Sequence, residues 1–270
     1  MGSPMRGLNA MKTRKRWLSL PVLIVASLLA PLGARAQRVT WTIDGVERQA
    51  DVYVPEKDPR PNKIPVVFAF HWHGGTMQQD AQVFHFQKVW PEAIVVYMQG
   101  LPTRANSPND YGWQHEAGVE GDRDLKFFDT VLADLRQKFP IDDRRIYASG
   151  FSDGAQFTYF LWSARPKTFA AFAIVAGRIL APSVKITEPR PVYYVVGTQD
   201  PGYKQIMAAM DMVKQLNGAT GEGVACGEMC TKYASPKGAP VITYIHDHGH
   251  VYPIPISTQF VEFFKQHTLD

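Results

Sequence analysis

The chain has 270 residues, which is long enough for one large α/β domain with a sizeable buried core. Apolar residues make up 45% of the sequence and charged residues 20%, a balance that excludes a disordered or fibrous protein. The formal net charge is +4, but six of the 29 basic residues lie in residues 1–36, which leaves 23 basic against 25 acidic residues. The remaining chain therefore gives no reason to expect nucleic acid as a partner.

Residues 1–36 have the three parts of a secretory signal peptide. Basic residues cluster within 12–16, an apolar run covers 17–32, and small residues precede a cleavage site near Ala36. A membrane anchor is the alternative, but the run is shorter than the ~20 residues of a spanning helix and contains two prolines. We expect a secreted or periplasmic protein without a stable membrane anchor, whose mature domain covers residues 37–270.

Two cysteines, Cys226 and Cys230, lie four positions apart. In an oxidising compartment this spacing favours a local disulfide over two free thiols. A metal site would need further ligands nearby, and the surrounding sequence supplies none. We therefore expect a disulfide here, and neither a metal nor a cofactor.

The predicted mature domain opens with an antiparallel hairpin. Residues 39–43 and 46–54 alternate around Asp44-Gly45, a dipeptide typical of a tight hairpin turn. Several short apolar runs follow, rich in Val, Ile, Tyr and Phe without clean alternation, as in strands buried on both faces of a mostly parallel sheet. These runs cover residues 65–70, 93–98, 145–149, 169–175, 191–196 and 240–245.

Stretches with helical character separate most of these runs. Residues 100–121 are instead polar and predict a long loop near a functional site. Strands that alternate with helices predict one doubly wound α/β domain, with a mostly parallel central sheet and helices on both faces. The predicted helices cover residues 122–139, 153–165, 203–216 and 257–267.

The strongest motif is Gly150-Phe151-Ser152-Asp153-Gly154, a G-x-S-x-G pattern between a predicted strand and a predicted helix. The turn is too tight for bulky residues, and it pushes the serine hydroxyl out at the carboxyl end of the sheet. The start of the following helix favours negative charge that develops there. We predict that Ser152 is a nucleophile; the alternative is a structural turn that happens to contain serine.

A serine nucleophile needs a base and an acid. In the fold that presents its serine on a G-x-S-x-G turn, they follow the serine in the order Asp or Glu, then His. Asp200 comes just after the strand at residues 191–196, where such an acid is expected. A turn aspartate before proline is the alternative interpretation. Asp211 lies inside a predicted helix and Asp247 lies among histidines, so both fit less well.

The base is expected among His246, His248 and His250, which follow the last predicted strand. We favour His250, because the glycine before it gives the turn freedom to bring the ring to the serine. His248 is the main alternative, and His246 is nearer the strand and expected to be packed. A metal-binding set of three histidines is a further, weaker alternative.

Two backbone N–H groups should bind the oxyanion of an acyl-transfer intermediate. One is that of Asp153, directly after the nucleophile. The other is expected in residues 71–75, after the first buried strand, and we favour the N–H of His73. The imidazoles of His71 and His73 are expected to bond loop carbonyl groups rather than to take part in chemistry.

With these motifs in this order, the chain resembles an extracellular esterase family of the α/β-hydrolase superfamily. That family includes polyhydroxybutyrate depolymerases, feruloyl esterases and LpqC-type proteins. Two departures stand out: Trp72 follows His71 where the family has glycine, and Asp153 stands where several relatives have asparagine. The segments that carry the resemblance are residues 71–76, 111–113, 142–147, the serine motif, 169–171, 197–201 and 249–253.

The resemblance implies the α/β-hydrolase fold and an esterase that forms an acyl-enzyme on Ser152. It supports Asp200 and His250 over their alternatives. Feruloyl or acetyl esters of plant polysaccharide are the favoured substrates, with polyhydroxyalkanoate-type polyesters second and a non-catalytic glycan-binding protein as the alternative from another class. Three aromatic residues are expected to line the substrate site or, equally, to pack in the core: Trp72, Trp113 and Tyr252.

Overall fold

The computed structural model describes residues 1–2, 35–56, 61–104, 107 and 109–270. The chain divides into two compact units, Met1–Leu32 and Gly33–Asp270, and every described helix and strand belongs to the second. Nearly all of the predicted signal peptide lies outside the described residues, so it stays a prediction. None of the helices in the described part of the chain has the length and apolar character needed to span a membrane.

Ten strands form one sheet in the spatial order β1-β2-β4-β3-β7-β8-β9-β12-β11-β10. Six neighbouring strands, from β4 to β12, run parallel, and antiparallel strands extend the sheet at both edges. The strands are β1 (Arg35–Ile43), β2 (Val46–Val54), β3 (Ile64–Phe70), β4 (Ile94–Met98), β7 (Ile141–Phe151), β8 (Ala171–Val175), β9 (Val192–Gly197), β10 (Val224–Gly227), β11 (Cys230–Tyr233) and β12 (Val241–His246).

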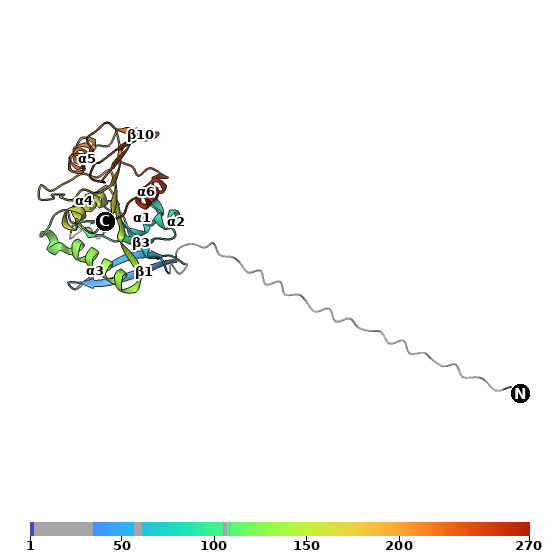
Figure 1. Ribbon diagram of the computed structural model, residues 1–270. Coiled ribbons are helices and arrows are strands. Elements are labelled where there is room, and N and C mark those ends of the chain that lie inside the picture. The colour runs from blue at the N-terminus through green and yellow to red at the C-terminus, as the bar shows by residue number, and fades with distance from the viewer. Residues whose placement is uncertain (3–34, 57–60, 105–106, 108) are drawn as a thin grey trace. The chain divides into compact units, whose positions relative to one another are not determined.

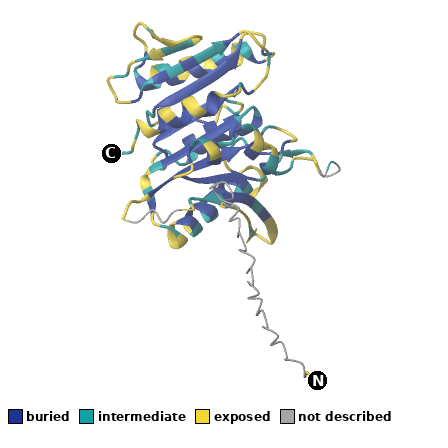
Figure 2. Cartoon of the chain, turned by 90° about the vertical axis from the view of Figure 1, so that its right-hand side faces the viewer, coloured by how far each residue is buried: buried dark blue, intermediate teal, exposed yellow. Residues whose placement is uncertain are grey.

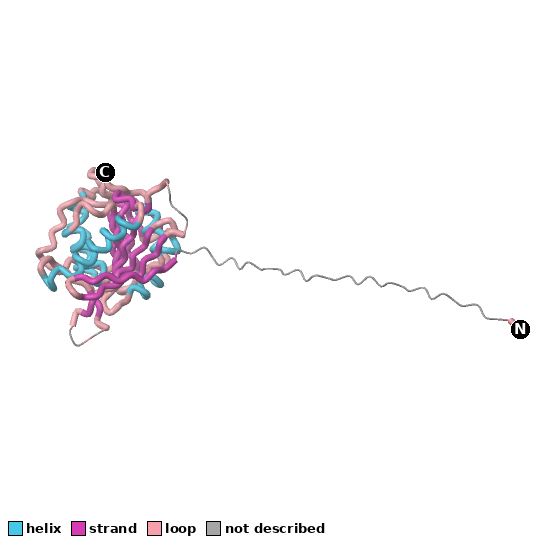
Figure 3. The backbone as a smooth tube through the Cα atoms, turned by 90° about the horizontal axis from the view of Figure 1, so that it is seen from below, coloured by secondary structure: helices cyan, strands magenta, loops and turns pink. Residues whose placement is uncertain are grey.

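Helices cover both faces of this sheet (Figures 1 and 3). In Figure 1, α3, α4 and α5 lie on one side of the strands, and α1, α2 and α6 lie on the other. The helices are α1 (Met77–Val83), α2 (Phe86–Val89), α3 (Arg123–Lys138), α4 (Asp153–Ala164), α5 (Tyr203–Asn217) and α6 (Ile256–Lys265). The predicted mostly parallel sheet with helices on both faces is thus confirmed.

The central strands are buried on both faces, as their unbroken apolar runs predict. Every residue of β3, β4, β8 and β9 is buried, and these strands appear as the dark blue centre of Figure 2. The predicted N-terminal hairpin is also present, because β1 pairs with β2 in antiparallel register around Asp44-Gly45. Arg35 and Ala36 belong to β1, so cleavage after Ala36 would remove its first two residues.

Three features differ from the sequence-based expectation. The short helices α1 and α2 were not predicted, because seven and four residues are too few to show a helical period. The hairpin β10–β11 was also missed, and its predicted disulfide between Cys226 and Cys230 is present. The expected loop at residues 100–121 contains a two-residue strand pair, β5 (Leu101–Pro102) and β6 (Tyr111–Gly112), and a 3₁₀ turn (Val119–Asp122) begins within it.

Candidate active site

The serine motif forms a strained turn between β7 and α4. Ser152 has φ 56° and ψ −112°, a backbone conformation that non-glycine residues rarely adopt. The flanking glycines have no room for a side chain: a Cβ on Gly150 would lie 2.3 Å from the carbonyl oxygen of Gly154, and one on Gly154 would lie 2.0 Å from that of Phe70. The strain is therefore held by close backbone packing, and it presents the Ser152 hydroxyl at the carboxyl end of β7.

Ser152, His250 and Asp200 form one hydrogen-bonded chain. The Ser152 hydroxyl lies 2.8 Å from Nε2 of His250, and the other ring nitrogen, Nδ1, lies 2.6 Å from Oδ2 of Asp200. The second oxygen of Asp200 accepts the backbone N–H of Gly202 at 2.7 Å. Asp200 is buried, whereas the His250 side chain is 39% exposed to solvent. Such a chain can take the hydroxyl proton as the oxygen attacks a carbonyl carbon.

Backbone contacts between two loops bring His250 to Asp200. The N–H groups of Thr198 and Gln199, after β9, donate to the carbonyl oxygens of His246 and His248, after β12. Gly197 permits this approach, because a Cβ there would lie 2.0 Å from the carbonyl oxygen of His248. The parallel pairing of β9 with β12 places both loops at the same edge of the sheet.

The other C-terminal histidines lie outside this chain of hydrogen bonds. His246 is buried, burial lowers its pKa, and its Nδ1 accepts the N–H of His248. The ring of His248 is 74% exposed and lies beside Asp247. Within the described residues, no group of three His, Cys, Asp or Glu side chains is close enough to hold a metal ion.

The turn after β3 packs against the start of α4, where the oxyanion donors were expected. The carbonyl oxygens of Phe70 and His71 both approach Gly154. His71 is buried, and burial lowers its pKa to about 4. Its neutral ring donates to the Trp72 carbonyl at 2.8 Å and accepts the Gly100 N–H at 2.9 Å, which ties two loops together. The N–H groups of His73 and Asp153 remain the predicted donors.

Within the part of the chain that the structure describes, the His73 imidazole bonds a carboxylate and no loop carbonyl, so that expectation was wrong. It donates to the carboxylate of Asp110 at 2.6 Å and is 48% exposed. A carboxylate 37 residues away is a partner that local sequence cannot indicate.

Two of the three aromatic residues predicted as substrate contacts lie in the core. Trp113 is 1% exposed, stacks on Phe157 and donates its indole N–H to the carbonyl of His71. Tyr252 is also buried, where its ring stacks on Phe84 and its hydroxyl bonds Ser257. Of the two alternatives left open for these residues, core packing therefore describes Trp113 and Tyr252, since each ring is buried and its polar atom is hydrogen-bonded.

Trp72 remains partly exposed and contacts an aromatic residue that was not predicted. The centre of its ring lies 5.9 Å from the centre of the Phe151 ring, and the centres of the Phe151 and His250 rings are 5.1 Å apart. Phe151 is part of the serine motif itself, so its position directly before Ser152 was a signal that could have been used. Trp72 and Phe151 form an aromatic surface beside His250.

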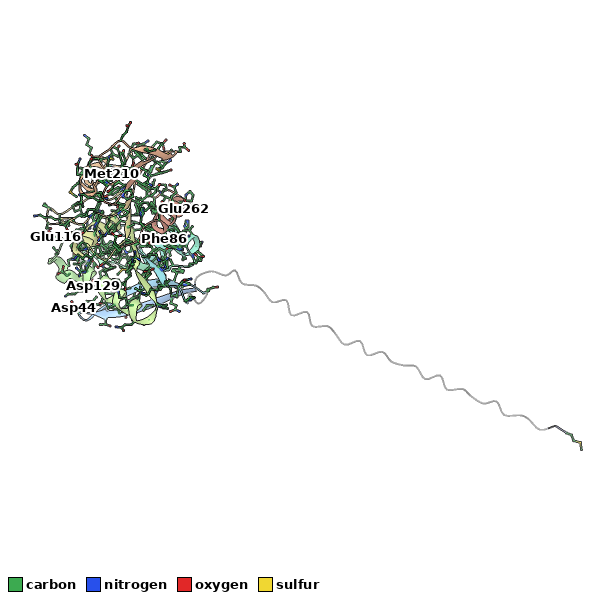
Figure 4. All side chains as sticks on the ribbon, in the orientation of Figure 1. Asp44, Phe86, Glu116, Asp129, Met210 and Glu262 are labelled. Atoms are coloured by element: carbon green, nitrogen blue, oxygen red, sulfur yellow. A yellow bond between two sulfur atoms is a disulfide. The ribbon has the colours of Figure 1, made fainter. Side chains whose placement is uncertain are left out.

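A second histidine–aspartate pair lies next to Ser152 in the sequence motif and was also missed. His115 donates from Nε2 to Oδ1 of Asp153 at 2.6 Å, and the backbone N–H of Trp113 donates to Oδ2. Asp153 is buried, and His115 belongs to the loop before α3. Figure 4 shows the next residue, Glu116, on the side of the sheet that carries α3, α4 and α5. This pair attaches that loop to the start of α4.

The chain is similar in sequence to named esterases, although no protein-family model matches it. It is 28% identical over 170 residues to a bifunctional acetylxylan esterase/xylanase of Neocallimastix patriciarum, a match that covers 60% of this chain and 23% of that protein. It is 26% identical over 217 residues to feruloyl esterase D of Neurospora crassa, covering 73% of this chain and 71% of that one. The chain therefore spans about a quarter of the first relative's length.

Solved structures resemble the whole described domain. An acetyl xylan esterase from Aspergillus awamori has a TM-score of 0.64 at 16% identity, covering 86% of this chain and 99% of that one. A ferulic acid esterase has a TM-score of 0.62 at 13% identity, covering 87% and 97%. Together with the sheet order and the Ser152 turn, these likenesses show that the chain has the α/β-hydrolase fold and is similar to feruloyl and acetylxylan esterases.

Proposed function

We propose that this chain is a serine esterase that hydrolyses carboxylic esters through an acyl-enzyme on Ser152. The observation that carries the proposal is the hydrogen-bonded chain from the Ser152 hydroxyl through His250 to buried Asp200. The names of the two sequence relatives support the same chemistry.

In the first half-reaction, the Ser152 oxygen attacks the ester carbonyl carbon while Nε2 of His250 accepts the hydroxyl proton. Asp200 keeps the His250 ring in the required tautomer, because its carboxylate accepts the Nδ1 proton. The protonated ring then gives its Nε2 proton to the alcohol oxygen, and the C–O bond breaks to leave an acyl-enzyme. In the second half-reaction, His250 activates water in the same way and the carboxylic acid leaves.

The N–H groups of His73 and Asp153 are the proposed donors to the oxyanion. Asp153 begins α4, whose first turn also contributes a favourable dipole to negative charge. The approach of the turn after β3 to Gly154 supports this role, because it brings the His73 segment next to the same helix start.

Feruloyl or acetyl esters of plant polysaccharide are the proposed substrates, on the strength of the relatives' names. The aromatic surface of Trp72 and Phe151 supports an aromatic acyl group, which can pack against such rings. Polyhydroxyalkanoate-type polyesters and a non-catalytic glycan-binding role are the alternatives, and substrate ranking separates them.

Export is part of the proposal. Residues 1–36 would be removed as a signal peptide, and residues 37–270 would form the catalytic domain outside the cytoplasm. The Cys226–Cys230 disulfide supports this, since disulfides persist in oxidising compartments. Mass determination of the exported protein would show whether the chain begins near Gln37.

The test compares the native protein with Ser152→Ala and His250→Ala on nitrophenyl butyrate, methyl ferulate and acetylated xylan. Each change should lower kcat/KM by about 10⁴-fold or more while the protein stays folded. The residues act as one catalytic unit, so the loss of either one removes most of the rate enhancement of the whole unit. His248→Ala is the matched control, since that ring is exposed beside Asp247 and should leave hydrolysis within about twofold. Persistent turnover in Ser152→Ala would contradict the mechanism; a folded native protein inactive on every ester would favour the glycan-binding alternative.

A further inference from the structure

A pocket of about 330 Å³ opens beside the Ser152 hydroxyl, on the side of β7 where β8 and β9 end. This is the opposite side of β7 from β3, whose following turn holds His73. The volume is at the lower end of the range for small-ligand pockets, about 300–1,000 Å³. The pocket therefore has room for one compact part of an ester. Its lining consists of Ser152, Gln156, Ala176, Arg178, Asp200, Pro201, Gly202, Ile206 and His250.

Arg178 supplies a positive charge to this pocket. It follows β8, its side chain is half-buried, and no ion pair or hydrogen bond joins its guanidinium to any residue in the described part of the chain. The negative group that faces it is Asp200: Nη1 of Arg178 lies 3.6 Å, and Oδ1 of Asp200 lies 3.2 Å, from the point where a Cβ on Gly202 would stand. Each oxygen of the Asp200 carboxylate already accepts a hydrogen bond, one from His250 and one from the Gly202 N–H. Arg178 thus keeps its donors for a ligand.

Gln156 supplies the second unsatisfied group. Its side-chain oxygen is buried and has no hydrogen-bond partner among the described residues, although the residue lines the same pocket. A buried acceptor without a donor is destabilising, so it marks a place where a hydroxyl or N–H group of a ligand would fit. The pocket therefore offers a cation and an acceptor beside the nucleophile.

We propose that the esterase selects esters in which the part next to this pocket carries a free carboxylate and a hydroxyl group, as in a uronic acid acylated on one of its hydroxyl groups. The guanidinium of Arg178 would donate two parallel hydrogen bonds to the carboxylate, a geometry that lysine or glutamine does not provide. A sugar hydroxyl would donate to the Gln156 oxygen. Ile206 and Ala176 supply apolar surface for the face of the ring. This inference rests on the proposed function, and it adds that the preferred substrate carries a negative charge.

The experiment measures a selectivity ratio, kcat/KM for a charged ester divided by kcat/KM for its neutral counterpart. One pair places the carboxylate in the acyl part: the mono-4-nitrophenyl ester of succinic acid against 4-nitrophenyl butyrate. The other places it in the alcohol part: 4-acetoxybenzoate against its methyl ester. Acetate release from acetylated polygalacturonate, before and after methyl esterification of its carboxylates, repeats the second comparison on a polymer.

Arg178→Gln should lower the selectivity ratio of at least one pair by about 10- to 100-fold, the worth of a hydrogen-bonded charge, and Arg178→Lys should lower it less. Lys204→Gln is the matched control. This substitution also removes one positive charge, but Lys204 is exposed in the first turn of α5 and does not line the pocket. Gln156→Leu should weaken turnover of the acetylated polygalacturonate more than that of 4-nitrophenyl butyrate.

An unchanged ratio for both pairs in Arg178→Gln would overturn the inference. If the ratio stays unchanged because activity on charged and neutral esters falls equally, Arg178 instead supports Asp200; if neither activity falls, Arg178 has no part in the reaction. Both results leave the esterase itself in place. Absence of ester hydrolysis by the native protein is a separate outcome, which would overturn the proposed function and the selectivity built on it.

Discussion

Directly after Ser152, this chain has a buried carboxylate, Asp153, at the start of α4, where the proposed oxyanion donors lie. A negative charge there opposes the oxyanion unless a cation or donor offsets it. His115 donates to that carboxylate at 2.6 Å. The two residues therefore form a unit: the histidine fixes the carboxylate, and the carboxylate accepts the Trp113 N–H that attaches the neighbouring loop.

His115→Ala should lower kcat/KM for 4-nitrophenyl butyrate by about tenfold, because it leaves the buried Asp153 carboxylate without its imidazole donor. Asp153→Asn in the same protein should recover most of that loss, since the amide carries no charge. The coupling in this double-mutant cycle is expected at about 1–2 kcal/mol. Additive losses would show that the pair does not act as a unit.

Asp80 is a different kind of buried carboxylate. It lies in α1 at 0% exposure, and neither of its oxygens has a hydrogen-bond partner among the described residues. Burial raises its pKa well above the usual value. Burial also raises the pKa values of Tyr97 and Tyr252, and the charge of Asp80 raises both further. The folded protein therefore holds the Asp80 proton more tightly than the unfolded chain does.

Because the folded pKa of Asp80 is raised, the stabilising effect of its proton is complete below the unfolded value of about 4 and is lost as pH rises towards the folded value. Asp80→Asn should thus raise the Tm relative to the native protein at pH 8, and the difference should shrink towards pH 4. A difference of about 1–3 kcal/mol corresponds to several degrees for a domain of this size. Thermal melts across this pH range check it.

Asp44→Asn is the matched control for Asp80, because the Asp44 carboxylate is 66% exposed beside Lys126. That change should move the Tm little at any pH. A constant gap between native protein and Asp80→Asn from pH 4 to 8 would mean that ionisation of Asp80 is not the cause.

At the scale of the elements, one buried ion pair joins the N-terminal hairpin to α3. Arg48, in β2, donates to Asp124 at 2.6 Å, and both side chains are almost fully buried. The other Asp124 oxygen accepts the Gln114 N–H, next to His115. The guanidinium also lies 4.2 Å from the centre of the Phe127 ring. The hairpin, α3 and the loop that contacts Asp153 thus meet at one buried carboxylate, Asp124, which Arg123 also contacts at 3.4 Å.

Arg48→Met should lower the free energy of unfolding by about 3–5 kcal/mol, because it removes the closer and fully buried cation of Asp124 and leaves only Arg123, at 3.4 Å. Arg38→Met is the matched control on the same hairpin: Arg38 also pairs with a carboxylate, Asp51, but its own side chain is 51% exposed, and its loss should cost about 1 kcal/mol or less. Urea unfolding of the three proteins gives the comparison. Equal costs for the two changes would contradict the role of burial.

Elements with a long or repeated pattern were predictable, and short ones were not. The helices α3, α4, α5 and α6 were expected within a few residues of their observed bounds. The helices α1 and α2 depend on their contacts with the sheet and with α6, because isolated helices of that length are not stable in water. Their existence is a tertiary effect.

At the scale of the whole molecule, the sheet order brings distant segments to one edge. The carboxyl ends of β7, β8, β9 and β12 lie side by side, and they lead into Ser152, Arg178, Asp200 and His250 respectively. The general rule that ligands bind at the carboxyl ends of parallel strands would have indicated Arg178 from the sequence. No such rule indicates His115, because its contact with Asp153 spans 38 residues and depends on how a loop folds back.

The sequence by itself determined the strained Ser152 turn, the two-sided burial of the central strands and the N-terminal hairpin, because each depends on residues that are neighbours in the chain. Tertiary structure decided which histidine meets the serine, since His250 and Ser152 are 98 residues apart and only the pairing of β9 with β12 brings the ring into place. It also decided that Trp113 and Tyr252 are core residues. Aromatic side chains suit a core and a binding site equally, and packing alone distinguishes the two.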